Sequence, residues 1–186
     1  MEKSLIIAGF GGQGVMVSGQ LIGYSITETT NNYVTFLPSY GAEQRGGTAN
    51  CFVVISDEEI GSPKPFPADY VMILNDPSLD AFEGSAQTGG TIFLNTSVVS
   101  KKVTRTDVKT VEVPANDIAV ELGNTKVANL VMVGAFVGYT GLIAPEKVLE
   151  TVFKKLGKKR PELNPLNEAA FNKGLILGRE AAARLQ

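Results

Sequence analysis

Apolar and polar residues alternate along the chain in two patterns as far as residue 122. Short apolar runs between turn residues are typical of buried strands, and apolar positions every three or four residues are typical of helices. The runs predict strands at 4–9, 33–37, 51–56, 69–74, 91–95 and 108–113. The second pattern predicts helices at 13–30 and 115–122, and a third starting with Asp76 as N-cap and Pro77 at the first helical position.

Beyond residue 125 every predicted element is a helix, with segments at 126–140, 145–156 and 166–185. Strands alternating with helices, then a helical tail, indicate an α/β three-layer domain with a mainly parallel, Rossmann-like sheet and a C-terminal helical segment. The first 40 residues form a βαβ-like start. No linker is long enough to divide the chain, so residues 1–186 are expected to be one domain.

One uncharged stretch, residues 127–144, is near the lower length limit for a membrane-spanning helix. It contains Asn129 and Tyr139, and Pro145 follows at once, so a fully buried helix of a globular domain is favoured. Gly134 and Gly138 are spaced to let another element approach the helix backbone.

The composition excludes several kinds of chemistry. The chain is 44% hydrophobic and 19% charged with a net charge of −2, which is ordinary for a globular protein and gives no reason to expect nucleic acid or a membrane as partner. One cysteine and no histidine exclude an iron–sulfur cluster, a Cys-rich zinc site, His-ligated metals and His-based catalysis on this chain, so any chemistry must rest on carboxylates, Lys, Tyr, backbone amides or another chain. No metal site and no catalytic residue are predicted here. Cys51 is expected to be buried. Without a leader-like segment at the start, a cytoplasmic protein is expected.

The stretch GFGGQG, residues 9–14, satisfies the dinucleotide pattern Gly-x-Gly-x-x-Gly between a predicted strand and a helix. Such a turn presents backbone N–H groups to an anion. NAD is disfavoured, because the second strand ends in Phe36-Leu37-Pro38-Ser39 without the acid that binds ribose hydroxyls. A tight turn that needs glycine only for its geometry remains the alternative. The amide of Gln13 is not needed in a plain dinucleotide turn.

A second glycine-rich motif, SYGAEQRGGTAN at residues 39–50, makes the pair more specific than either motif alone. With VVISDEEIGSP, LNDPSLDAF and NTKVANLVMVGAF, these motifs resemble the gamma subunit of the 2-oxoacid:ferredoxin (acceptor) oxidoreductases. The resemblance covers most of the chain. A stand-alone nucleotide-binding protein and a purely structural assembly module remain alternative functions.

The resemblance implies an accessory subunit, inactive alone, of an enzyme that converts a 2-oxoacid and coenzyme A to acyl-CoA and CO2 and reduces ferredoxin or a similar acceptor. It implies partner alpha, beta and delta subunits that carry thiamine diphosphate, magnesium and iron–sulfur clusters, with coenzyme A as co-substrate. 2-Oxoglutarate is preferred, with a branched-chain 2-oxoacid close behind. The isolated chain is expected to form a homodimer.

The resemblance also implies ligand-binding or active-site-edge residues, beside the active site and near coenzyme A. They are Gly11, Gly12, Gln13 and Gly14 in the first motif, and Tyr40, Gly41, Glu43, Arg45, Gly46, Gly47 and Thr48 in the second. Arg45 can hold a carboxylate or phosphate bidentately. An ion pair with Glu43 or a partner subunit is the alternative.

Two further sets of residues have open interpretations. The basic segment KKLGKKRP, residues 154–161, is expected at a helix end, either as a solvated terminus or as a site for the phosphates of coenzyme A. Asn75 and Asp76 follow a predicted strand at the edge where open α/β sheets bind ligands. A cap is favoured over a ligand for Asp76.

Overall fold

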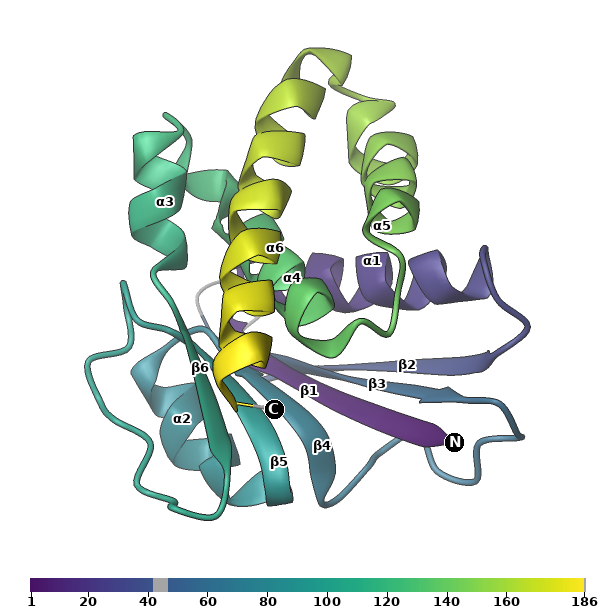
Figure 1. Ribbon diagram of the computed structural model, residues 1–186, viewed down its shortest axis with the longest axis vertical. Helices are drawn as coiled ribbons and strands as arrows, with labels where there is room; N and C mark the ends of the chain where they lie inside the picture. Colours follow the sequence, from purple (N-terminus) through teal and green to yellow (C-terminus); the bar gives the residue numbers. More distant parts are fainter. Residues whose placement is uncertain (42–46, 186) are drawn as a thin grey trace.

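One six-stranded sheet organises the fold in the computed structural model, which describes residues 1–41 and 47–185. The strands lie in the spatial order β2–β3–β1–β4–β5–β6 (Figure 1). Their bounds are β1 (Glu2–Phe10), β2 (Tyr33–Tyr40), β3 (Thr48–Ser56), β4 (Ala68–Ile73), β5 (Ala86–Asn95) and β6 (Lys109–Val113). β1, β4, β5 and β6 are parallel neighbours, whereas β3 pairs antiparallel with β1 and β2. The predicted mainly parallel sheet is confirmed.

Helices cover both faces of this sheet, which confirms the three-layer α/β prediction. α1, α4 and α6 pack on one face, α5 packs against α1, and α2 covers the other face (Figure 1). The helices are α1 (Val15–Thr27), α2 (Asp76–Phe82), α3 (Ala115–Glu121), α4 (Ala128–Thr140), α5 (Pro145–Val152) and α6 (Asn164–Leu185). Short helical turns are η1 (Glu83–Ser85), η2 (Thr125–Val127), η3 (Phe153–Gly157) and η4 (Pro161–Leu163). The described chain after β6 is helical, as predicted.

Alternating side chains of the strands build an apolar core on each face. In β1, Leu5 and Ile7 belong to the core under α1, α4 and α6, while Ile6 and Ala8 belong to the core under α2. None of these four is more than 1% exposed. Successive strand side chains point to opposite faces, so a strand covered on both sides needs a continuous apolar run such as this one.

The β1–α1–β2 start is present, but its two strands are not neighbours. β3 separates them by pairing with β1 along the whole strand, from Glu2 opposite Ser56 to Phe10 opposite Thr48. β2 pairs only with β3 and lies at the edge of the sheet. Consecutive antiparallel strands need only a short connection, so β2 and β3 pair with each other and join the sheet through β3.

α4 is the buried helix predicted within residues 127–144. Its glycines meet α6 at close range: a Cβ atom on Gly134 would lie 2.1 Å from the carbonyl oxygen of Phe171. The approach is reciprocal, because a Cβ on Gly174 of α6 would lie 1.9 Å from the carbonyl oxygen of Val131. The described residues include no helix long and apolar enough to cross a membrane.

Candidate functional site

The first glycine motif connects β1 to α1 at the edge of the sheet where the connections change sides. α1 follows β1 on one face, and α2 follows the adjacent β4 on the other (Figure 1). Open α/β sheets bind ligands in the crevice at such a point. Gly12 (φ +98°) and Gly14 (φ +82°) have left-handed backbones, which glycine adopts without strain. The strand–turn–helix context predicted for this motif is confirmed.

Gln13 points its side chain inward and ties three segments together. Its Oε1 accepts hydrogen bonds from the backbone N–H of Phe10 (2.7 Å) and the side-chain amide of Asn75 (3.1 Å). Its Nε2 donates to the carbonyl oxygen of Leu74 at 2.9 Å. The amide therefore joins the end of β1 to the end of β4 and to the start of α2. A ligand-binding role for Gln13 stays a prediction.

Asn75, not Asp76, is the N-cap of α2. The Oδ1 of Asn75 accepts from the backbone N–H of Ser78 at 2.9 Å. Asp76 instead accepts from the backbone N–H of Lys101 (3.1 Å), and from the backbone N–H (2.9 Å) and hydroxyl (2.8 Å) of Ser100. The hydrogen bonds from Lys101 and then Ser100 lower the pKa of Asp76. The predicted cap was wrong by one residue, because an extended backbone at Asn75 leaves its own side chain to meet the first helical N–H groups.

The second glycine motif lies directly beside the first. The backbone N–H of Gly11 donates to the carbonyl oxygen of Gly47 at 2.9 Å, and that of Gly41 donates to the carbonyl oxygen of Thr48 at 2.8 Å. Tyr40 is 59% exposed and lines a groove of about 300 Å³ with Gly11 and Gly12. The structure thus brings the described members of both motifs together.

Three predicted site residues, Glu43, Arg45 and Gly46, lie outside the described residues. Their roles, including bidentate anion binding by Arg45, stay predictions.

A polar cavity of about 190 Å³ opens at the same edge of the sheet, next to Gly12 and Gln13. Three asparagines line it: Asn95 from the end of β5, Asn116 from α3 and Asn129 from α4. Asn95 donates to the Oδ1 of Asn116 at 2.8 Å. Among the residues described, no carboxylate lines this cavity. Lys126 lines it as well, so the site can offer neutral amides, backbone N–H groups and one ammonium group to a ligand.

Sequence reasoning missed these three asparagines. Asn95 carried a usable signal, because it ends a predicted strand at the ligand edge, as Asn75 does. Asn129 was noted only as a polar residue within an apolar helix.

The dinucleotide interpretation finds no support in the sheet order. The ribose-binding acid of that fold ends the strand beside β1. Here β3 occupies that place and runs in the opposite direction, while β2 is one strand further out. The lack of an acidic residue at the end of β2 therefore agrees with the strand order, in which β2 is not the neighbour of β1.

Cys51 is fully buried, as predicted. Its Sγ donates to the carbonyl oxygen of Val15 at 3.6 Å, and burial raises the pKa of its thiol to about 12. A buried thiol with that pKa acts as a small apolar residue. Across residues 1–41 and 47–185, no three His, Cys, Asp or Glu side chains gather as metal ligands would.

Comparison with known proteins gives relatives that cover nearly the whole chain. The family model described as "Pyruvate ferredoxin/flavodoxin oxidoreductase" matches residues 4–176. 2-Oxoglutarate synthase subunit KorC of Methanocaldococcus jannaschii is 32% identical over 97% of this chain and 96% of its own length. Ketoisovalerate oxidoreductase subunit VorA of Methanothermobacter marburgensis is 41% identical over 76% of this chain, but the chain spans only 30% of that protein.

Solved structures share the fold. The gamma subunit of a keto/oxoacid ferredoxin oxidoreductase from Geobacter sulfurreducens has a TM-score of 0.82 at 24% identity, covering 96% of this chain and 99% of that one. A 2-oxoglutarate:ferredoxin oxidoreductase from Magnetococcus marinus, with 2-oxoglutarate, coenzyme A and succinyl-CoA bound, has a TM-score of 0.88 at 23% identity. It covers 96% of this chain, which spans 31% of that one. By the family match over residues 4–176 and the relationship to KorC, the chain belongs to the pyruvate ferredoxin/flavodoxin oxidoreductase family.

Proposed function

We propose that this chain is the gamma-type, accessory subunit of a 2-oxoacid:acceptor oxidoreductase that forms acyl-CoA and CO2 and reduces ferredoxin or a similar acceptor. The observation that carries the proposal is the end-to-end match to KorC, a subunit of 2-oxoglutarate synthase, over 97% of this chain and 96% of that one. We prefer 2-oxoglutarate as the substrate. A branched-chain 2-oxoacid is the close alternative, in line with the VorA relative.

The proposal places the redox chemistry on other chains. One cysteine can supply only one thiolate to an iron–sulfur cluster, and such clusters need several. Alpha, beta and delta subunits would carry the clusters, thiamine diphosphate and magnesium, with coenzyme A as co-substrate. This chain would be a single domain, cytoplasmic, inactive alone and dimeric when isolated.

Within the assembly, we assign the two glycine motifs to the coenzyme A side of the active site. The backbone N–H groups at the start of α1 favour an anionic or carbonyl group. Gly12 is exposed, and no atom lies within 4 Å of the position its Cβ would take, so a partner chain or ligand can approach its backbone. From the second motif, Tyr40 lines the same groove as Gly12, and Thr48 pairs with Phe10 at the end of β1.

The test is coenzyme A-dependent ferredoxin reduction by the reconstituted complex. Gly12→Val should impair assembly or acyl-CoA formation while the isolated chain stays folded. Arg45→Ala should weaken coenzyme A-dependent turnover by the about 1.5–3 kcal/mol of a charge-assisted hydrogen bond. Melting temperature of each isolated variant is the control. Normal turnover of Arg45→Ala, together with unfolding of Gly12→Val, would refute the assignment.

One observation favours a second function, a purely structural assembly module. The carbonyl oxygen of the Gln13 side chain is already occupied by Phe10 and Asn75, so the turn is held together without any ligand. If the chain is only an assembly module, Gly12→Val should lower the yield of complex. In the complex that still forms, the Michaelis constant for coenzyme A should be unchanged.

A further inference from the structure

β2 is an edge strand that leaves one side of its backbone unpaired. Within residues 1–41 and 47–185 it pairs with β3 alone, and Figure 1 shows it at the border of the sheet beside α1. Its eight residues, YVTFLPSY, include no charged side chain, and its register with β3 has no shift. The opposite edge strand, β6, has five residues and carries Lys109 and Glu112. Because strands that stay free are usually short, charged or bulged, β2 is built as a strand that pairs with another chain.

The hydrogen bonds to β3 determine which backbone groups of β2 point outward. The N–H of Gly41, just past the end of β2, donates to the carbonyl oxygen of Thr48 at 2.8 Å, in the register of the whole ladder. In an antiparallel pair, residues that bond across the ladder alternate with residues that do not, so the odd-numbered residues of β2 bond to β3. The residues that turn their backbone groups to the free edge are Val34, Phe36, Pro38 and Tyr40. A proline is tolerated there because its nitrogen faces outward.

The α1 side of this edge has an apolar groove at one end and an exposed aromatic ring at the other. The groove measures about 180 Å³, and its walls include Tyr24 and Thr27 of α1 and Val34 and Phe36 of β2. Tyr40 is on the same face of the strand, because side chains alternate between faces, and it is 59% exposed. One copy of the chain cannot bring the ring to its own groove, since the two lie at opposite ends of β2.

We propose that β2 pairs with β2 of a second copy of this chain, antiparallel about a two-fold axis through Leu37. This register sets Val34 opposite Tyr40 of the second copy, and Phe36 opposite Pro38 of the second copy. Every outward N–H of the strand then meets an outward carbonyl oxygen, which no other register achieves within the eight residues of β2.

The same symmetry fills both grooves. The ring of Tyr40 from each copy lies beside Val34 of the other copy, at the open groove, so the interface uses the same surface twice. This reciprocal fit favours a second copy over an extended segment of an unrelated chain, which would need only the backbone edge.

This inference names the surface of the dimer expected for the isolated chain, and it rests on that part of the proposed function alone. A chain that stays monomeric can still be a gamma-type subunit. Coenzyme A-dependent ferredoxin reduction tests that role separately.

Cysteine cross-linking tests the register. At the two-fold axis the two Leu37 Cα atoms would be about 4.5 Å apart, a distance that a disulfide spans. Leu37→Cys should therefore form a disulfide-linked dimer under a mild oxidant, seen on a non-reducing gel. Ser39→Cys is the matched control: residue 39 is more exposed and on the same face, but its two copies would be about 13 Å apart. The native Cys51 is buried and does not compete.

Sedimentation equilibrium tests the side-chain contacts. Tyr40→Ala should raise the dissociation constant of the dimer about tenfold or more, because both grooves lose their cover. Tyr33 is 50% exposed on the same strand, but its side chain is on the other face, so Tyr33→Ala should change the constant less than twofold.

A native chain that is monomeric at every concentration would overturn the proposal and leave the edge to an extended segment of another subunit. Cross-linking of Ser39→Cys as readily as Leu37→Cys, or equal weakening by the two tyrosine variants, would overturn it as well. Circular dichroism of each variant confirms that a lost dimer is not a lost fold.

Discussion

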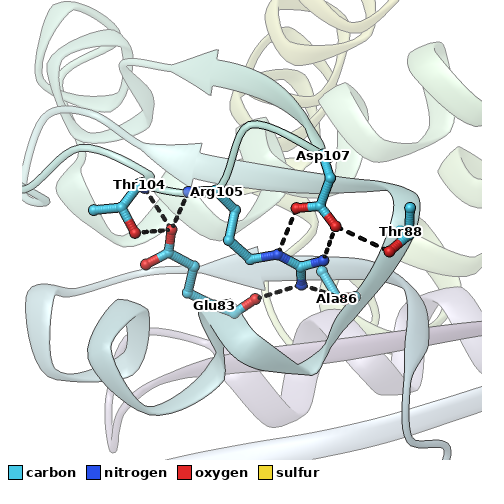
Figure 2. Close-up of polar contacts among 6 residues, drawn as sticks. All are labelled: Glu83, Ala86, Thr88, Thr104, Arg105 and Asp107. Atoms are coloured by element: carbon cyan, nitrogen blue, oxygen red, sulfur yellow. Dashed lines mark hydrogen bonds and ion pairs between the residues drawn. The ribbon is translucent and has the colours of Figure 1, made fainter.

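Two polar clusters at opposite edges of the parallel sheet use opposite kinds of chemistry. At the carboxyl edge, one neutral side chain, Gln13, joins β1, β4 and the cap of α2 through three hydrogen bonds. At the amino edge, the chain that enters β6 is fastened to η1 and the start of β5 by a cluster of charges around Arg105 (Figure 2). The Gln13 contacts use neutral groups within the fold, and the Arg105 cluster uses ions near water.

Figure 2 shows how the charged cluster is built. The guanidinium of Arg105 pairs with Asp107 through Nε (2.9 Å) and Nη2 (2.6 Å), and its Nη1 donates to the carbonyl oxygens of Glu83 and Ala86. Thr88 donates to Asp107 at 2.9 Å. The hydrogen bonds from Arg105 and then Thr88 lower the pKa of Asp107 to about 2.

The carboxylate of Glu83 completes the cluster. Its Oε1 accepts the backbone N–H of Arg105 at 2.9 Å and the hydroxyl of Thr104 at 2.9 Å. Burial works to raise its pKa, but the hydrogen bonds from Arg105 and Thr104 outweigh it, and the pKa of Glu83 is lowered.

The contrast separates two ways of holding a loop. A neutral amide that satisfies backbone groups is costly to remove, because those groups are left without partners, yet it does not respond to pH. Exposed ion pairs are individually weak and respond to both acid and salt. The Gln13 contacts beside the candidate site are therefore insensitive to ionic conditions, whereas the Asp76 carboxylate, which holds the loop after β5 at the same edge, is ionised.

The largest effect should follow from Gln13→Leu. The variant leaves the N–H of Phe10 and the carbonyl of Leu74 unpaired and removes the partner of Asn75. We expect the free energy of unfolding to fall by about 2–4 kcal/mol, from one or two part-buried groups left unsatisfied. Urea denaturation followed by circular dichroism measures this.

Gln20→Leu is the matched control. Gln20 is exposed on α1, so the same substitution should change stability by no more than about 0.5 kcal/mol. Equal losses in the two variants would show that Gln13 holds nothing that an exposed glutamine does not.

A smaller effect is expected from alanine substitution of one glycine at each edge of the sheet. Gly12 (φ +98°) and Gly89 (φ +77°) both have left-handed backbones and no atom within 4 Å of a Cβ position. Alanine at either should cost about 1–2 kcal/mol from backbone strain alone. Only Gly12→Ala should also lower the yield of complex with partner subunits. If Gly89→Ala lowers that yield as much, backbone strain explains the effect and the Gly12 turn has no special role in assembly.

The sequence predicted the layers, the strands and the glycine turn because each depends on a local pattern: apolar runs, helical periodicity and glycine between them. It did not predict β3 between β1 and β2, since strand pairing depends on contacts far apart in the chain. For the same reason, it did not predict that Gln13 points inward or that Asn75 caps α2. It also did not predict the site amides of Asn95 and Asn116. Their partners come from other strands and helices, and no spacing within one motif reveals them.

The smallest effect, and the one that separates the two edges most cleanly, is the response to acid. The pKa of Asp107 is lowered from 3.8 to about 2 in the folded chain. The unfolded chain therefore binds this proton first as pH falls, so the contribution of Asp107 is complete above about pH 5 and is lost progressively as the pH falls through 3.8 toward 2. Asp107→Asn should lower the melting temperature by about 2 °C or less at pH 7, because the pair is exposed.

That difference between native chain and variant should shrink as the pH is lowered from 5 to 3. The deficit of Gln13→Leu should stay constant over the same range, because a glutamine has no proton to gain. Differential scanning calorimetry of both variants at pH 7, 5, 4 and 3 makes the measurement. A constant deficit for Asp107→Asn would mean that its charge contributes nothing to holding β6, and that the entry to β6, like the Gln13 turn, is held by neutral hydrogen bonds.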